Sequence, residues 1–175
     1  MEWLHNLNRQ IFLQINAAVD ASPALISAAT FVAEDLVTLM FTALLVLFLW
    51  RYRSDKKLIV GVLVSICCAV AMTYLIRKGV DSPRPFMVGV GTNFLPHSAS
   101  SSFPSKHATP VFAAAAFLLL YAKTRGIAVI WLALTLAVAW SRIYLGVHWP
   151  LDMLGAAVVG LCGAFIAKGA VRNFN

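Results

Sequence analysis

Residues 126–145 read GIAVIWLALTLAVAWSRIYL, and this stretch decides the fold class. An apolar run of this length is typical of a helix that crosses a bilayer, and the polar pair Ser141-Arg142 lies near its end. Four further apolar runs lie at residues 23–50, 58–76, 107–122 and 151–167. The sequence therefore predicts an all-α integral membrane bundle of about five transmembrane helices, some at the short end of the usual range.

Composition supports the same class. Of 175 residues, 61% are hydrophobic and 12% are charged, whereas soluble domains use roughly 45–50% and 25%. The length fits one domain over residues 1–175, and no Pro- or Gly-rich linker divides it. The net charge of +7 comes from short basic clusters between apolar runs, so no nucleic-acid partner is expected. The oligomeric state is left open.

The first residues differ from the later runs. Apolar residues recur at helical spacing from Leu4 to Val19, against the polar Asn6, Arg9 and Asn16. This pattern predicts an amphipathic helix over residues 1–20 that lies at the membrane interface.

Basic residues between the runs set the expected topology. They are Arg51, Arg53, Lys56 and Lys57, then Lys123 and Arg125, then Lys168 and Arg172. The positive-inside rule places all three groups in the cytoplasm. With five spans, the N-terminus, residues 77–106 and residues 142–150 then share the outer face.

Some reactive groups lie within the apolar runs. Glu34 and Asp35 either face a polar interior or mark an interface where the helix enters the bilayer near Leu36. The three cysteines lack the paired spacing of a zinc site or a disulfide framework, so they are expected to be buried thiols.

The segment from Ser141 to Asp152 reads SRIYLGVHWPLD and carries a possible nucleophile. Pro150 suits the first turn of a helix, and His148 and Asp152 are four residues apart, so both can face the same direction. The carboxylate can then hold Nδ1–H of the imidazole and leave Nε2 free to attack, with Arg142 beside it. Alternatively, His148 is an interfacial anchor next to Trp149.

A second segment, Phe103-Pro-Ser-Lys-His107, precedes the run 107–122. Ser105 is placed to cap that helix, so the amides of Lys106 and His107 would point outward and bind phosphate. His107 could then protonate a leaving oxygen. By itself, this segment fits a helix cap with an incidental histidine better than a catalytic site.

Arg84 lies between two prolines in an extended stretch, where its planar fork matches phosphate oxygens. Alone it could contact lipid headgroups. Together, three arginines, two histidines and an aspartate at one membrane face predict a phosphate pocket.

Residues 77–152 resemble the type 2 phosphatidic acid phosphatase superfamily. Its signature is Lys, six residues, Arg-Pro; then Pro-Ser-Gly-His; then Ser-Arg, five residues, His, three residues, Asp. The third part is complete here. Arg77 stands in place of the first lysine, with Lys78 one step out of register, so either could supply that charge. Lys106 occupies the glycine position.

Within that superfamily, residues 96–107 and 140–152 resemble the bacitracin-resistance type of undecaprenyl-diphosphatase. The resemblance implies a hydrolase of the bacterial cytoplasmic (inner) membrane, acting at the outer, periplasmic face. It would convert undecaprenyl diphosphate to undecaprenyl phosphate and inorganic phosphate for peptidoglycan synthesis, without metal or other cofactor. His148 would attack phosphorus, His107 would protonate the leaving lipid phosphate, and Asp152 would orient His148. The phosphate-binding residues would be Arg77, Arg84, Ser105, Lys106 and Arg142.

Two other functions remain open at this stage. One is a phosphatase or phosphotransferase for another lipid phosphate, such as phosphatidylglycerol phosphate or a lipid A phosphate. The other is a non-catalytic subunit of a membrane transporter, which the intact His107, His148 and Asp152 disfavour. His97 lies outside the signature and is expected to be an ordinary loop residue.

Overall fold

The computed structural model describes residues 2–172, and all regular secondary structure in that range is helical. The helices are α1 (Glu2–Ile15), α2 (Pro23–Ala33), α3 (Asp35–Arg51), α4 (Lys56–Gly79), α5 (Ala108–Leu120), α6 (Arg125–Tyr144) and α7 (Pro150–Val171). Short 3-10 turns occur at Pro85–Val88 and Ala122–Thr124. The predicted all-α class is confirmed.

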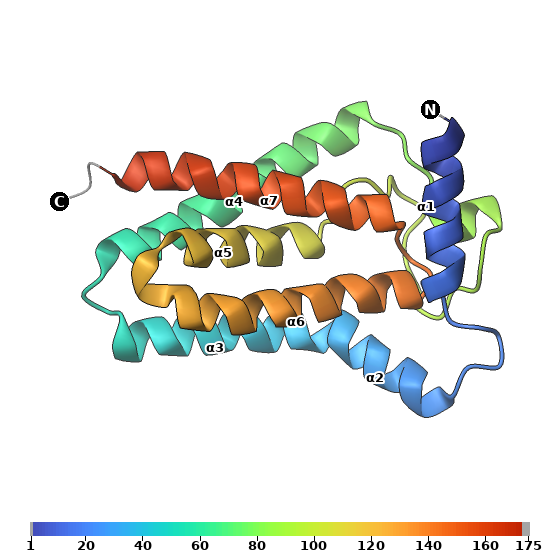
Figure 1. Ribbon diagram of the computed structural model, residues 1–175, viewed down its shortest axis with the longest axis horizontal. Coiled ribbons are helices and arrows are strands. Elements are labelled where there is room, and N and C mark those ends of the chain that lie inside the picture. The colour runs from blue at the N-terminus through green and yellow to red at the C-terminus, as the bar shows by residue number, and fades with distance from the viewer. Residues whose placement is uncertain (1, 173–175) are drawn as a thin grey trace.

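The expected membrane spans correspond to these helices. Four helical stretches in the described range are long and apolar enough to cross a bilayer: Pro23–Arg51, Lys56–Gly79, Ala122–Tyr144 and Pro150–Val171. The remaining expected span is α5, which has only 13 residues. Figure 1 shows α5 inside the bundle, where it contacts α4, α6 and α7.

Small residues allow the neighbouring helices to approach α5 closely. A Cβ atom on Gly160 of α7 would lie 2.7 Å from the backbone nitrogen of Ala113 in α5. A Cβ on Gly61 of α4 would collide with the ring of Phe117. Close backbone packing of this kind is what small residues permit between membrane helices. It holds the middle and the C-terminal half of α5, the helix that follows the predicted phosphate-binding segment.

Helix α1 lies across one end of the bundle (Figure 1). It ends at Ile15, so the expected helix over residues 1–20 is too long. The Asn16 side-chain amide donates to the carbonyls of Thr92 (2.9 Å) and Tyr144 (3.0 Å). The amide of Ala17 also donates to the carbonyl of Tyr144, at 2.9 Å. These tertiary bonds replace helical ones and tie α1 to the site end of α6.

The first apolar run is two helices instead of one. It breaks at Glu34, between α2 and α3, and both Glu34 and Asp35 are exposed on the surface of the bundle. Of the two alternatives, a buried polar environment is therefore wrong for these carboxylates. The break leaves the carbonyl of Ala33 able to accept a hydrogen bond from Nη1 of Arg142, at 3.0 Å.

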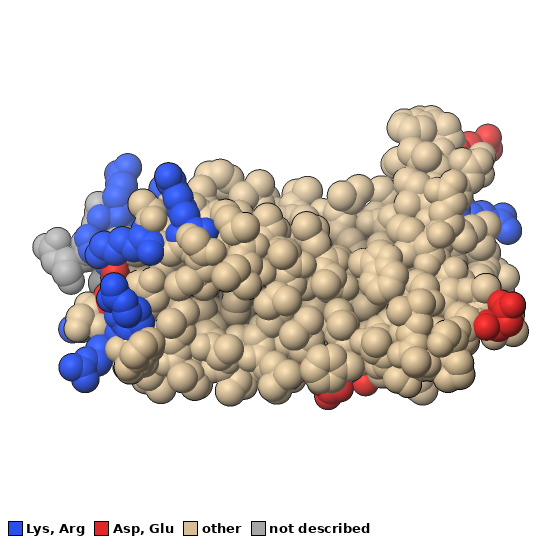
Figure 2. All heavy atoms as spheres, turned by 60° about the horizontal axis from the view of Figure 1, so that its bottom comes forward, with Lys and Arg blue, Asp and Glu red and all other residues tan. Residues whose placement is uncertain are grey.

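Many large hydrophobic side chains are exposed along the helices of the bundle. On the face shown in Figure 2, basic residues gather at one end and few charged residues lie between the two ends. That end contains the last turns of α3 and α7 and the first turn of α4. Cys67 and Cys162 are exposed on the apolar surface, so the expectation that these thiols are buried is wrong. Apolar side chains of a membrane protein can face lipid and need no protein around them.

Candidate active site

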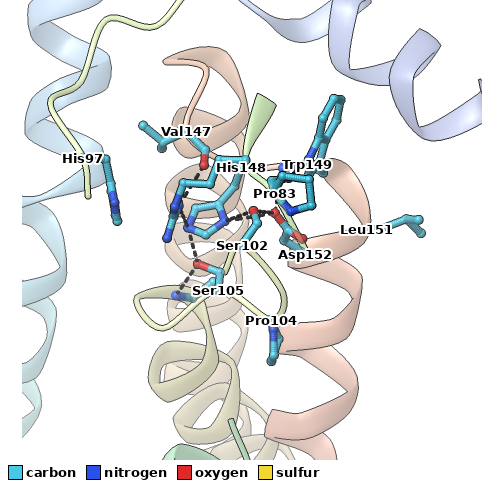
Figure 3. A network of polar contacts seen from close by, with 12 residues as sticks. Pro83, His97, Ser102, Pro104, Ser105, Val147, His148, Trp149, Leu151 and Asp152 are labelled. Carbon is cyan, nitrogen blue, oxygen red and sulfur yellow. Dashed lines mark hydrogen bonds and ion pairs between the residues drawn. The ribbon is translucent and has the colours of Figure 1, made fainter. Parts of the chain in front are cut away.

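The predicted functional segments meet at the end of the bundle that α1 crosses. Arg142 lies on the last turn of α6, and His148 lies in the turn that leads into α7. Ser105 and His107 immediately precede α5, and Arg84 comes from the long connection between α4 and α5. Figure 3 shows Ser102, Ser105 and Asp152 close to the His148 ring.

A tight turn sets the position of His148. The amide of Gly146 donates to the carbonyl of Ile143 (3.0 Å), and the amide of Val147 donates to that of Arg142 (3.2 Å). Gly146 has φ +84°, and a Cβ there would lie 2.1 Å from the carbonyl oxygen of Thr92. Only glycine fits this left-handed position without strain. The turn is buried and holds His148 on a rigid support.

Asp152 holds one side of the His148 ring. Nδ1 of His148 lies 3.0 Å from Oδ2 of Asp152, and both side chains are almost fully buried. The same oxygen accepts the amide of Trp149 at 2.8 Å and the hydroxyl of Ser102. Pro150 begins α7, as expected, and puts Asp152 in its first turn. The pair predicted from four-residue spacing is therefore formed, with two further donors.

The other ring nitrogen faces Arg84. Nη1 of Arg84 lies 3.1 Å from Nε2 of His148, and Oγ of Ser105 lies 3.3 Å from it. Because a guanidinium only donates, Nε2 accepts and Nδ1 carries the proton toward Asp152. Nε2 therefore faces Arg84 and Ser105 and points away from Asp152. Arg84 is itself fixed by bonds to the carbonyls of Val147 (2.9 Å) and Ser100 (3.1 Å).

Ser105 lies two residues before the N-cap of α5, which is His107, but it still contacts the first turn of the helix. Its hydroxyl accepts the amide of Ala108 at 3.3 Å, and its carbonyl accepts the amide of Thr109 at 3.0 Å. Among the described residues, positive φ occurs only at glycines, so Lys106 replaces the usual glycine without a strained backbone. The side chains of Lys106 and His107 are exposed.

Arg77 and Lys78, the two cations of the first motif, have different surroundings in the structure. Arg77 reaches the site, because its guanidinium donates to the carbonyl of Pro104 (3.0 Å) and to the hydroxyl of Ser100 (3.3 Å). Lys78 is exposed, and its ammonium lies over the ring of Tyr74, 4.6 Å from the centroid. Of the alternatives left open by the sequence, Arg77 is the one placed beside the site.

Arg142 has spare hydrogen-bonding capacity. Its side chain is 1% exposed, and its Nε has no hydrogen-bond partner within residues 2–172. A buried unpaired donor costs about 1–3 kcal/mol, so an anion that accepts from it would be favoured. This feature suits a phosphate-binding arginine.

Positive charge dominates the site. Burial, then the charges of Arg84 and Arg142, hold the pKa of His148 well below its ordinary value. Although much of the His107 side chain is exposed, partial desolvation and then the charge of Arg142 lower its pKa to about 4. Burial and neighbouring Arg77 lower the pKa of Arg84 to about 10, which still leaves it charged at neutral pH. The site therefore presents neutral imidazoles among charged arginines, as an anion-binding site requires.

Two polar residues beside His148 were not predicted as site residues. Ser102 is fully buried and contacts both His148 and Asp152. The ring of His97 lies 6.0 Å from that of His148 and 6.2 Å from that of His107, between centroids. Nothing in the sequence distinguishes Ser102 from the serines before it, and His97 belongs to no motif.

The residues do not form an evident metal site. Within residues 2–172, no group of three or more His, Cys, Asp or Glu side chains is arranged to hold a metal ion.

The helical bundle and its three motif segments define the class of protein. The chain belongs to the PAP2 superfamily, whose family model matches residues 57–175. It is similar over most of its length to proteins with assigned activities. It is 39% identical, over 94% of this chain and 83% of the relative, to "Putative undecaprenyl-diphosphatase YbjG" of Escherichia coli strain K12. It is 28% identical to the undecaprenyl-diphosphatase BcrC of Bacillus subtilis strain 168, over 91% of this chain and 82% of that protein.

Solved structures show the same fold. LpxE of Aquifex aeolicus superposes with a TM-score of 0.70 and 26% identity, covering 93% of this chain and 95% of that one. A PAP2-type phosphatidylglycerolphosphate phosphatase of Bacillus subtilis superposes with a TM-score of 0.73 and 21% identity, covering 100% of this chain and 90% of that one. The second likeness concerns the fold alone. The expected multi-pass membrane architecture is confirmed.

Proposed function

We propose that this chain hydrolyses undecaprenyl diphosphate to undecaprenyl phosphate and inorganic phosphate. The observation that carries the proposal is His148, held by Asp152 at Nδ1 while Nε2 faces Arg84 and Ser105. This is the arrangement that an imidazole nucleophile for phosphorus needs. The identity to relatives named as undecaprenyl-diphosphatases supports the choice of lipid.

The first step forms a phosphohistidine. Nε2 of His148 attacks the terminal phosphorus, and the bond from that phosphorus to the bridging oxygen breaks. Asp152 stabilises the positive charge that develops on the ring. His107, protonated once the substrate anion is bound, gives its proton to the departing lipid phosphate. As the substrate enters, Nη1 of Arg84 gives up its hydrogen bond to Nε2 of His148 and donates to a phosphoryl oxygen instead.

The transition-state charge spreads over the equatorial phosphoryl oxygens. Arg77, Arg84 and Arg142 bind these oxygens, together with Ser105 and the amide of Lys106. The unpaired Nε of Arg142 gains an acceptor in this complex. Fixed arginines and a helix end thereby supply the electrostatic stabilisation that a metal supplies in other phosphatases.

The second step hydrolyses the phosphohistidine. His107, now neutral, takes a proton from water, and the water oxygen attacks phosphorus. The bond between phosphorus and Nε2 breaks, inorganic phosphate leaves, and His148 returns to its original tautomer. No external co-reactant besides water is required.

We place this reaction in one domain, residues 1–175, at the outer face of the bacterial cytoplasmic membrane. The basic end of the bundle supports this orientation, because the site lies at the opposite end (Figures 1 and 2). Helix α1 then lies along the outer interface and closes the site through Asn8, which accepts the amide of Leu151 at 3.0 Å.

The test is phosphate release by detergent-purified protein in excess chelator. A panel would contain undecaprenyl diphosphate, phosphatidylglycerol phosphate and a lipid A phosphate. We expect chelator-resistant turnover, fastest on the polyprenyl diphosphate and abolished by His148→Ala. Preference for a glycerolipid monoester would replace the substrate assignment, whereas activity that survives in His148→Ala would remove the nucleophile. No turnover on any lipid would favour a non-catalytic membrane subunit.

A further inference from the structure

The connection that carries His97 is fixed on both sides of this residue. Before it, the amide of Phe94 donates to the carbonyl of Leu145 at 3.0 Å, and Leu95 is buried in the cluster around the α6–α7 turn. After it, the carbonyl of Ser100 accepts Nε of Arg84 at 3.1 Å. A residue between two such anchors has a defined position over the site.

The His97 ring faces both histidines of the proposed mechanism. Its centroid lies 6.0 Å from that of His148 and 6.2 Å from that of His107, and each pair is inclined by 78°. Figure 3 shows His97 on the opposite side of His148 from Asp152. The space beside Nε2 of His148 is therefore flanked by His97 as well as by His107.

The surroundings of His97 favour an anion. Burial, then the charge of Arg84, lowers the pKa of the His97 ring, and Arg142 and Arg77 act in the same direction. A phosphate among these arginines would cancel their effect and allow the ring to protonate. Nδ1 lies 3.4 Å from the carbonyl oxygen of Ser98. A protonated ring could keep that contact and donate from Nε2 to a phosphate oxygen.

A diphosphate needs such an additional contact. Arg84 and Ser105 contact Nε2 of His148, where the terminal phosphoryl group must lie for attack, and the charge of Arg142 acts on the same ring. The lipid-linked phosphate then lies beyond the bridging oxygen that His107 protonates. His97 lies as close to His107 as to His148, so its ring is within reach of a phosphate bound next to His107.

We propose that His97 binds the lipid-linked phosphate of the substrate and makes the site prefer diphosphates over monophosphates. This inference rests on the proposed function and names the residue that selects its substrate class. It changes His97 from an ordinary loop residue into a specificity-determining one.

Calorimetric titration of the detergent-purified protein tests this without turnover. The probes are methylenediphosphonate, which keeps two linked phosphoryl groups, and inorganic phosphate. Losing a hydrogen bond to a charged group costs about 1.5–3 kcal/mol, so His97→Ala should weaken methylenediphosphonate binding about 10-fold or more. Phosphate binding should change less than about twofold. The matched control is His5→Ala, on the exposed face of α1, which should change neither.

A second readout separates binding from a structural effect. Titrations in buffers of different ionisation enthalpy report proton uptake, and His97→Ala should take up fewer protons with methylenediphosphonate than wild type does. Equal weakening of both anions, no weakening of either, or unchanged proton uptake would overturn the proposal. So would wild-type protein that binds methylenediphosphonate no more tightly than phosphate. These titrations do not measure turnover, so they test the role of His97 alone. A wrong lipid assignment would show in the lipid panel described above and not in these titrations.

Discussion

At the scale of single residues, the site depends on how His148 is held. Asp152 fixes Nδ1, Arg84 contacts Nε2, and Ser102 contacts both members of the His148–Asp152 pair. The motif spacing predicted the first of these contacts. It could not predict Ser102, because only the folded connection shows which serine of a polar stretch turns inward.

Ser102→Ala tests this positioning role. Removing a hydrogen bond to a charged group costs about 1.5–3 kcal/mol, and we expect kcat to fall about 10-fold while KM changes little. The reason is that Asp152 and His148 lose orientation but the phosphate-binding groups remain. Steady-state kinetics would measure the change. Ser101→Ala is the matched control, since within residues 2–172 its hydroxyl bonds the carbonyl of Val80 and no other group. Equal effects of both substitutions, or a change confined to KM, would contradict the role.

The histidines also predict a pH dependence of stability. The pKa of His107 is lowered to about 4, below its ordinary value near 6.5. Between these values the unfolded chain binds more protons than the folded one, so stability rises with pH through this window and falls as the pH decreases. We expect the melting temperature in detergent to drop from pH 7 to pH 4.5, and to drop less in His107→Gln. His5→Gln should behave like wild type. If the melting temperatures of wild type and His107→Gln fell equally with decreasing pH, the lowered pKa of His107 would be contradicted.

At the scale of elements, helix ends bring the chemistry together. The sequence predicted helix starts at Pro150 and near Ser105 because proline and capping residues act locally. It did not predict the break between α2 and α3 or the end of α1 at Ile15. Those boundaries are set by tertiary bonds of Arg142 and Asn16, whose partners are far away in the sequence.

The α6–α7 turn gives an element-scale prediction. Gly146→Ala should destabilise the protein and reduce turnover, because its Cβ would meet the carbonyl of Thr92 at a left-handed backbone position. We expect a melting temperature lower by several degrees, measured by thermal unfolding in detergent. Gly126→Ala, in the first turn of α6 with nothing within 4 Å of a new Cβ, should be neutral or slightly stabilising. Equal melting temperatures for the two variants would show that the turn tolerates a side chain.

At the scale of the whole molecule, the apolar bundle has the amphipathic helix α1 across one end and a group of basic residues at the other. Hydropathy predicted this architecture well, because span length is a property of local sequence. Hydropathy did not show which side chains of the spans are buried, because an apolar side chain can face either lipid or protein. Cys67 and Cys162, expected to be buried, are exposed. The position of His97 over the site was not predictable for a different reason. It depends on how the long connection between α4 and α5 folds back onto α6.

Orientation in the membrane is testable by cysteine labelling. In a variant without Cys67, Cys68 and Cys162, Asp20→Cys should react with a membrane-impermeant maleimide on intact cells, because it is exposed at the end crossed by α1. Arg53→Cys, exposed at the basic end, should react only after lysis. The reverse pattern would place the site in the cytoplasm.

The most direct test of the mechanism is to trap the covalent intermediate. His107→Gln should still permit attack on a diphosphate, whose leaving group is a stable phosphate monoester, but should slow hydrolysis of the intermediate. After acid-free quenching, mass spectrometry of the variant incubated with undecaprenyl diphosphate should find phosphate on His148. Phosphate on another residue, or direct transfer to water with no protein-bound phosphate at any time during turnover, would contradict a His148 nucleophile.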